Sequence, residues 1–387
     1  MSDDRQIIGI TTVSHASVHT YELSIPILMV AWSEEFAVTP ATLGVIVGVG
    51  YALFGLGALP GGILADRIGS RPLIIGCLVG MSGGFLAMAF LPGLVGIAVG
   101  LVIWGASASV YHPSGLSLIT KGVDKRGRAL GYHGIAGNIG IGGGPLAAAV
   151  LLIFVDWRVV AALLAIPALA AAAFAFRLEF AEPVATDGGD ATGGKGFVAE
   201  SRALFASGFA VALVVAMASG LYYRGILTFL PEILSEPIDF DLGTGIEASH
   251  YVYSALLAVG VAGQYVGGRL AERDTEKRMA LGYGVLAVIA LLFVPVLGAR
   301  FALVGVSLVL GFFLFVVQPL YQNAIARHTP ENARGVSYGY TYLGVFGVGA
   351  LGATIAGTVL EYSTERMLFV VLALIAAGGS VAAVYLA

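Results

Sequence analysis

The sequence predicts an all-α membrane protein with twelve transmembrane helices in two six-helix, pseudo-symmetric halves. Three observations predict this fold: the composition, the division into apolar segments and an internal repeat. Of the 387 residues, 58% are hydrophobic and only 11% are charged, whereas a soluble domain has about 25% charged residues. The mean hydropathy is +0.91. Such a chain has too little polar surface to cover itself in water, so we expect it to lie in a lipid bilayer.

Twelve apolar segments follow one another along the chain, separated by clusters of charged and turn-forming residues. A transmembrane helix needs about 20 apolar residues. The first segment contains the polar residues His15, His19 and Glu22, unlike a cleavable signal peptide, whose apolar core is roughly 7–15 uninterrupted residues. We therefore expect a mature first helix. The predicted helices cover residues 6–32, 41–65, 72–91, 94–121, 127–154, 157–178, 203–234, 247–271, 278–297, 300–327, 334–360 and 365–386.

The second half of the chain repeats features of the first half. The turn at Asp66-Arg67 recurs in a weaker form at Glu272-Arg273, and the run 126–132 resembles the run 334–340. Prolines, Pro113 and Pro319, are expected to break the fourth and tenth helices. Two repeated six-helix halves are typical of secondary transporters, with the substrate site at the midplane between them. We expect domains at 1–180 and 201–387, joined by a Gly-rich cytoplasmic linker at 181–200.

The distribution of Lys and Arg predicts the orientation. With the N-terminus in the cytoplasm, 16 of the 20 basic residues fall in inside loops and helix ends, as the positive-inside rule requires. We expect a multi-pass protein of the plasma membrane with both termini cytoplasmic. The basic residues are scattered and the net charge is −4, so nothing indicates a nucleic-acid partner. The single Cys77 excludes an internal disulfide and fits a packed core residue.

Other machinery is not evident in the sequence. It has no Gly-x-x-x-x-Gly-Lys-Ser/Thr run of the kind that binds ATP, and no legible serine–histidine–acid arrangement. We therefore expect neither an ATP-driven pump nor an enzyme, and no cofactor. Because one chain contains both halves, we expect a functional monomer whose partners are a small-molecule substrate, protons and the lipid bilayer.

The loop between the second and third helices resembles the signature of the major facilitator superfamily, and the resemblance covers the whole chain. The pattern Gly-x-Leu-Ala-Asp-Arg-x-Gly-x-Arg is matched here, although Ser70 replaces the basic residue that the family usually carries. In the family this loop latches the cytoplasmic side in one state of the transport cycle, and the alternative is a turn that only sets topology. The matching gating-loop residues are Gly62, Asp66, Arg67, Gly69 and Arg71.

A second motif, Gly140-x-x-x-Gly144-Pro145 in the fifth helix, is similar to the antiporter motif of the family's exporters. Small residues four apart also allow two helices to pack closely, so packing alone is the alternative. Within the family, the chain resembles the fosmidomycin-resistance type of drug exporter. This resemblance is carried by His15 and His19 with Pro26, by Tyr111-His112-Pro113 and by Thr228-Phe229-Leu230-Pro231. The arginine common in the fourth helix of family exporters is absent.

Ionisable residues within the predicted helices are the candidates for proton coupling, because burying them in a membrane is costly. His15, His19 and Glu22 share one face of the first helix. Glu22 is the predicted proton carrier and His19 its rival. Arg224 in the seventh helix would bind an anionic substrate group or hold Glu22. The alternative for these residues is a hydrogen-bonded cluster that only fixes helix packing.

Further polar residues are candidates for lining a substrate cavity, with packing or gating as the alternative for each. His15 and His19, spaced i and i+4, also suit zinc, but six histidines are too few for a membrane di-iron enzyme, and we expect no metal. The predicted substrate-binding residues are His15, His19, Glu22, Tyr111, His112, His133, Tyr223, Arg224, Gln318, Gln322, Tyr338 and Tyr342.

The sequence thus predicts a secondary active transporter that works by alternating access, with proton-coupled efflux of a small organic molecule as the favoured reaction. A proton-coupled symporter or facilitator that takes up an organic anion is the alternative, in which Arg224 would be the binding charge. A membrane receptor or scaffold without transport activity is less favoured, because it has no need of polar groups at its centre.

Overall fold

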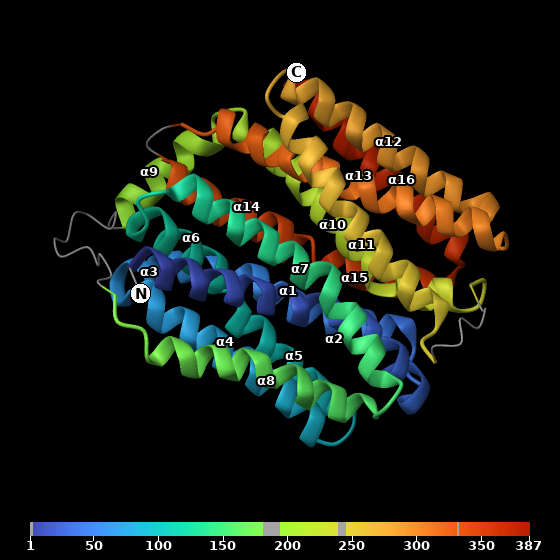
Figure 1. Cartoon of the computed structure of the whole chain (residues 1–387). Helices are drawn as coiled ribbons and strands as arrows, with labels where there is room; N and C mark the ends of the chain where they lie inside the picture. The colour runs from blue at the N-terminus through green and yellow to red at the C-terminus, as the bar shows by residue number, and fades with distance from the viewer. Residues whose placement is uncertain (1–2, 181–193, 239–244, 331–332) are drawn as a thin grey trace. The chain divides into compact units, whose positions relative to one another are not determined.

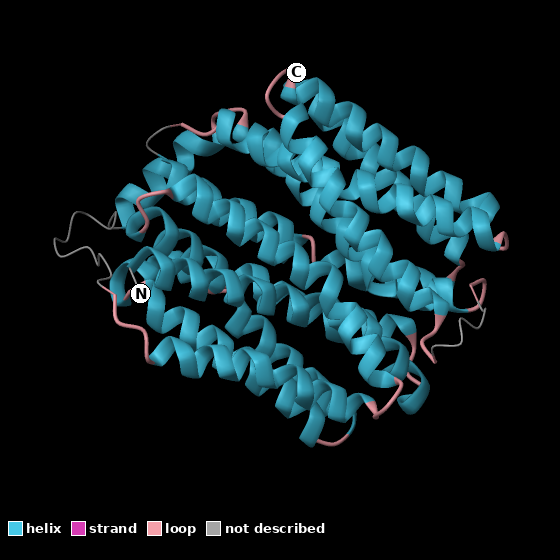
Figure 2. Cartoon of the chain, viewed as in Figure 1, coloured by secondary structure: helices cyan, strands magenta, loops and turns pink. Residues whose placement is uncertain are grey.

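The computed structural model describes residues 3–180, 194–238, 245–330 and 333–387. Within these ranges every regular element is helical (Figure 2). By their contacts the residues form two compact units. Figure 1 labels the helices of the chain. The N-terminal unit contains Met1–Phe36 and Val49–Ala191, and the C-terminal unit contains Ala37–Gly48 and Thr192–Ala387. The helix α2 (Pro40–Leu56) contributes residues to both.

The other helices of the N-terminal unit correspond to the first six predicted spans. They are α1 (Asp3–Phe36), α3 (Ala58–Ile68), α4 (Ser70–Phe90), α5 (Gly93–Ala108), α6 (Tyr111–Gly122), α7 (Arg126–Leu152) and α8 (Trp157–Phe176). The second span is divided at Gly57 into α2 and α3. The fourth is divided at Ser109–Val110 into α5 and α6. The predicted break lies just before Pro113, which occupies the first turn of α6, where the missing N–H costs no intrahelical bond.

The helices of the C-terminal unit correspond to the remaining spans. They are α9 (Gly194–Phe205), α10 (Phe209–Ser235), α11 (Ala248–Leu270), α12 (Thr275–Val296), α13 (Arg300–Arg327), α14 (Arg334–Tyr342), the π-helical stretch η2 (Leu343–Val348), α15 (Leu351–Tyr362) and α16 (Glu365–Leu386). The prediction of a break at Pro319 was wrong, since α13 continues through it. A bilayer helix tolerates proline when neighbouring groups satisfy the freed carbonyl. Most of the predicted linker lies outside the described residues, and α9 covers its end.

Ten helical stretches of the described chain are long and apolar enough to cross a membrane by length and composition. The two remaining predicted spans form α1, with 34 residues, and α11, with 23. Both carry polar side chains that are buried in the protein, Glu22 of α1 and His250 of α11 among them. Polar residues that face the protein interior lower a helix's mean hydropathy without exposing charge to lipid.

Glycines set the packing of α1 on α7. A Cβ atom at Gly140 would lie 2.2 Å from the carbonyl oxygen of Ala16, and one at Gly144 would lie 2.6 Å from the Cα atom of Thr20. No side chain fits at these distances. The two backbones therefore meet directly, as at small-residue interfaces of other membrane helices. This packing places His15 of α1 beside α7.

Candidate functional site

The polar face of α1 is the core of the candidate site. His15 and His19 are each 9% exposed, and Glu22 is 1% exposed. Nδ1 of His19 lies 2.5 Å from Oε2 of Glu22, and Nε2 of His19 lies 3.1 Å from Nε2 of His15. The helical spacing of these residues predicts their common face, and the structure connects them by hydrogen bonds into one chain of groups.

Residues of α6 and α7 complete the site around His15. The ring of His133 stacks on that of His15 with centroids 3.8 Å apart, and the backbone carbonyl of His133 lies 2.7 Å from Nδ1 of His15. Tyr111 donates a hydrogen bond from its hydroxyl group to the carbonyl of Thr11, and its oxygen lies 3.2 Å from Nε2 of His133. We call His15, His19, Glu22, Tyr111, His112 and His133 the histidine cluster.

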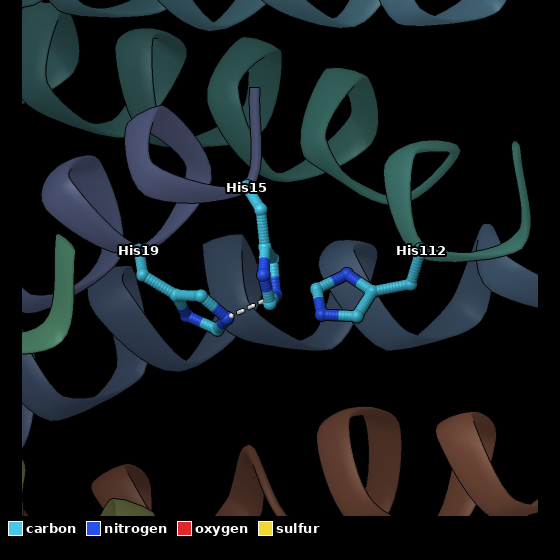
Figure 3. A group of neighbouring side chains, drawn as sticks. All are labelled: His15, His19 and His112. Atoms are coloured by element: carbon cyan, nitrogen blue, oxygen red, sulfur yellow. Dashed lines mark hydrogen bonds between the residues drawn. The ribbon is translucent and has the colours of Figure 1, made fainter. Parts of the chain in front are cut away.

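The ring of His112 meets both histidines of α1. Its centroid lies 5.4 Å from that of His15 and 5.6 Å from that of His19, with the planes nearly perpendicular. Figure 3 shows the His15 ring between the other two, with the His15–His19 hydrogen bond dashed. One ligand atom from each of the three imidazoles lies within 4.8 Å of the others. Imidazole nitrogens gathered in this way are the kind of donor set that could hold a transition metal.

The glycine at position 137 makes room for the cluster. A Cβ atom there would lie 2.4 Å from Cε1 of His15. Gly137, Gly140 and Gly144 therefore form one stripe on α7 that receives α1 and its imidazole. The small residues of the antiporter-like motif have a packing role here, and Pro145 lies inside α7 without ending it.

Arg224 lies among aromatic rings in the C-terminal unit. Arg224 is only 2% exposed. The guanidinium carbon lies 5.7 Å from the ring centroid of Tyr223 and 6.0 Å from that of Phe346. Phe346 in turn stacks on Tyr342, with centroids 5.7 Å apart and planes 8° apart. Cation–π contacts of this kind stabilise a buried guanidinium. Phe346 was not predicted, although it follows the predicted Tyr342 at the helical spacing of four.

Comparison with known proteins identifies the family. The family model described as the Major Facilitator Superfamily matches residues 12–353, which is most of the chain. The chain belongs to this superfamily. The predicted family is thereby confirmed, and the chain is a transporter rather than an enzyme.

Individual superfamily members are similar at low identity. The fosmidomycin resistance protein of Escherichia coli (strain K12) is 26% identical over 313 residues, covering 77% of this chain and 72% of that protein. The gentisate transporter of Corynebacterium glutamicum is 24% identical over 343 residues, covering 84% and 73%. A crystal structure of a variant of the nucleoside transporter NupG has a TM-score of 0.80 at 16% identity, covering 98% of this chain and 99% of that one. The predicted fold class is confirmed.

The superfamily's signature loop lies between α3 and α4. Gly69 adopts φ 91° there, a left-handed conformation that favours glycine. Arg71 donates hydrogen bonds to the carbonyl oxygens of Ala175 at 3.2 Å and Phe176 at 2.9 Å. A cation at the C-terminal end of a helix complements its dipole, so Arg71 ties α4 to the end of α8. The side chain of Asp66 lies outside the described residues.

The remaining predicted site residues are spread over several helices. Arg67 is exposed in the last turn of α3, and Gly62 approaches Pro113. Gln318 is half-buried and Gln322 exposed on α13, and Tyr338 is exposed on α14. These three polar residues are not members of the histidine cluster. Their role in substrate binding stays a prediction.

Proposed function

We propose that this superfamily transporter exports a small organic molecule in exchange for protons, by alternating access across the plasma membrane. The observation that supports this most is the hydrogen bond between Glu22 and His19 on a buried face of α1. Ionisable groups within a membrane helix are costly, so a buried pair of this kind is a candidate functional site. Protonation of the Glu22–His19 pair changes the charge at this site, so the proton gradient can drive a change there.

Two further observations support outward movement. The relative named as a fosmidomycin resistance protein covers most of the chain, and resistance is a property that export confers. The chain also has the glycine motif of exporters at Gly140 and Gly144, although close packing accounts for both residues. We propose that the monomer, with cytoplasmic termini, is the working unit.

A second candidate function is uptake of an organic anion. Arg224, buried among Tyr223 and Phe346, supports it, because a guanidinium beside aromatic rings suits an aromatic carboxylate. The similarity to a gentisate transporter favours the same reading. In this case Arg224, rather than Glu22, would decide whether substrate binds.

Inside-out vesicles with an acidic interior and a pH-sensitive dye test the proposal. Addition of a panel of drugs and organic anions should dissipate the acid interior in the wild type. Glu22→Gln should abolish this response, while the matched change Glu34→Gln, at an exposed position of the same helix, should preserve it. An equal response in wild type and Glu22→Gln would refute proton coupling through Glu22. Uptake of labelled anion that is lost in Arg224→Lys would support the second candidate.

A further inference from the structure

The tautomer of His15 is set by the backbone of α7. Nδ1 of His15 lies 2.7 Å from the carbonyl oxygen of His133. A carbonyl group can only accept, so Nδ1 must carry the hydrogen of this bond. A neutral imidazole carries hydrogen on one nitrogen only. Nε2 of His15 therefore presents a lone pair toward His19.

The contact with His19 then requires a hydrogen on the other ring. The two Nε2 atoms are 3.1 Å apart, which is a hydrogen-bond distance. Because His15 accepts, His19 must donate from its Nε2. Nδ1 of His19, 2.5 Å from Glu22, then either accepts from a protonated carboxyl group or donates to a carboxylate. These two forms differ only in where one proton lies along one bond.

Removal of that proton makes the arrangement unfavourable. The Glu22 carboxylate would draw the single hydrogen of a neutral His19 to Nδ1, and two lone pairs would face each other between the imidazoles. The residues are at least nine-tenths buried, so water is poorly placed to relieve the repulsion, and the low dielectric strengthens it. The two rings must then separate.

The other groups that face these rings limit the number of protons. His112 and His133 contact the rings of α1, and Tyr111 lies against His133. Tyr51 donates to the backbone carbonyl of Glu22 at 3.3 Å. In this group Glu22 is the one acid whose ordinary ionised form is negative near neutral pH. A second proton would leave a net positive charge on this buried group, which is unfavourable.

We propose that Glu22, His19 and His15 form a single site for one proton, that His15 is its fixed accepting end, and that the structure is the proton-loaded form. This inference rests on the proposed proton coupling and deepens it, because it assigns one proton per site and gives His133 a positioning role through its backbone. Loss of the proton parts His19 from His15, whose Nδ1 remains held by α7. Binding or loss of the proton therefore changes the position of His19 relative to His15, next to the contact between α1 and α7.

A bridging metal ion is the competing occupant of the same nitrogens. Zinc binds imidazole nitrogen at about 2.0–2.1 Å, so two nitrogens on one ion are at most about 4.2 Å apart. The ligand atoms of His15, His19 and His112 gather within 4.8 Å. However, the His15–His19 pair already satisfies hydrogen-bond geometry with its outer nitrogens occupied. We therefore favour the proton and include zinc in the test.

The test is nitrogen NMR of the full-length protein, labelled with ¹⁵N-histidine in lipid nanodiscs, over a pH series without substrate. Imidazole nitrogen shifts report which nitrogens carry hydrogen, and His15→Gln and His19→Gln assign the signals. We expect His15 to keep its hydrogen on Nδ1 throughout. His19 should donate from Nε2 to His15 in the loaded form and lose this bond in one single-proton transition.

The Glu22→Gln variant sharpens the test. A glutamine amide can donate to Nδ1 of His19 but cannot release a proton, so the transition of His19 should disappear and the loaded hydrogen bond should persist. Glu34→Gln should leave the transition as in the wild type. If Glu22→Gln does not fold, the wild-type spectra, assigned with the two histidine variants, still decide the tautomers.

Two results would overturn the inference. One is a hydrogen on Nε2 of His15, or a transition of His15 before that of His19. The other is stoichiometric binding of added Zn²⁺ that shifts both rings and is lost in His112→Gln, which would establish a metal site instead. Because the measurement needs no substrate, it stands apart from the vesicle assay: absence of flux would refute the proposed transport reaction and leave the proton site standing.

Discussion

The hydroxyl group of Tyr111 joins α6 to α1 at the edge of the histidine cluster. It donates to the carbonyl of Thr11 and lies beside Nε2 of His133. We expect Tyr111→Phe to lower the free energy of unfolding by about 0.5–2 kcal/mol, the range for hydrogen bonds between membrane helices. Unfolding in mixed detergent measures the change. Tyr362→Phe removes a hydroxyl from a residue that is 77% exposed and should have no effect; equal losses in both variants would contradict the argument.

Individual site residues were predictable only where they are close in sequence. The spacing of His15, His19 and Glu22 is sufficient to predict their common face. The meeting of α1 with Tyr111 and His133 joins residues about a hundred positions apart, and nothing in one sequence specifies such a contact. The backbone carbonyl of His133 leaves no sequence signal at all, because every residue has a carbonyl group.

At the scale of elements, the contact between α1 and α7 depends on particular glycines. A Cβ atom at Gly140 would overlap the backbone of Ala16, whereas one at Gly143 would meet nothing within 4 Å. We expect Gly140→Ala to destabilise the protein by about 1–3 kcal/mol, the usual cost of overpacking. Gly143→Ala should be neutral or slightly stabilising, because alanine favours a helix. Thermal unfolding of both variants checks this; a greater loss in Gly143→Ala would refute the assigned packing.

The contact between the end of α1 and the start of α8 should make stability depend on pH. Glu35 lies beyond the predicted span 6–32, and the Trp157 indole N–H, followed by the Arg158 guanidinium, holds the pKa of Glu35 below its ordinary value of 4.5. Because the folded pKa is the lower one, this stabilisation is present above pH 4.5 and is lost as the pH falls through the folded value. As the pH falls below 4.5, the melting temperature should fall less steeply in Glu35→Gln than in the wild type.

The exposed position of Glu35 keeps this effect small, because solvent screens such ion pairs. Glu34→Gln is the matched control, since Glu34 is a neighbouring exposed acid. Its melting temperatures should follow the wild-type curve. Parallel curves for the wild type and Glu35→Gln would show that the Trp157 and Arg158 contacts contribute nothing to the pH dependence.

Helix interruptions were the least predictable elements. Pro113 correctly indicated an interruption, whereas Pro319 did not, although both are prolines in apolar segments. The two helices differ around the proline. Ser109 and Val110 separate α5 from α6 before Pro113, whereas α13 is continuous on both sides of Pro319. The π-helical stretch Leu343–Val348 has no proline and no sequence signal that we recognised.

At the scale of the whole molecule, hydropathy and repetition were sufficient to predict the fold class. A lipid environment forces backbone groups to pair within helices, so long apolar segments have few alternatives. The orientation in the membrane stays a prediction from the distribution of basic residues. The domain limits 1–180 and 201–387 likewise stay predictions.

Thiol labelling can test the orientation, because the single cysteine, Cys77, is completely buried. In right-side-out vesicles, a membrane-impermeant maleimide should label Glu34→Cys, at the end of α1 that is predicted to face outward, and should not label Lys125→Cys, between α6 and α7. Both should react after permeabilisation, and the wild type should react in neither state. The reverse pattern would mean that the termini face outward.

The π-helical stretch has a consequence for the aromatic side chains beside Arg224. Each of its hydrogen-bonded rings contains one residue more than an α-helical ring. If the stretch migrates by one residue along the chain, the residues it passes turn by about 100° about the helix axis. Tyr342 and Phe346, which stack beside Arg224, lie at this point. Such a shift would turn the rings of Tyr342 and Phe346 relative to Arg224 while the helix stayed intact on both sides.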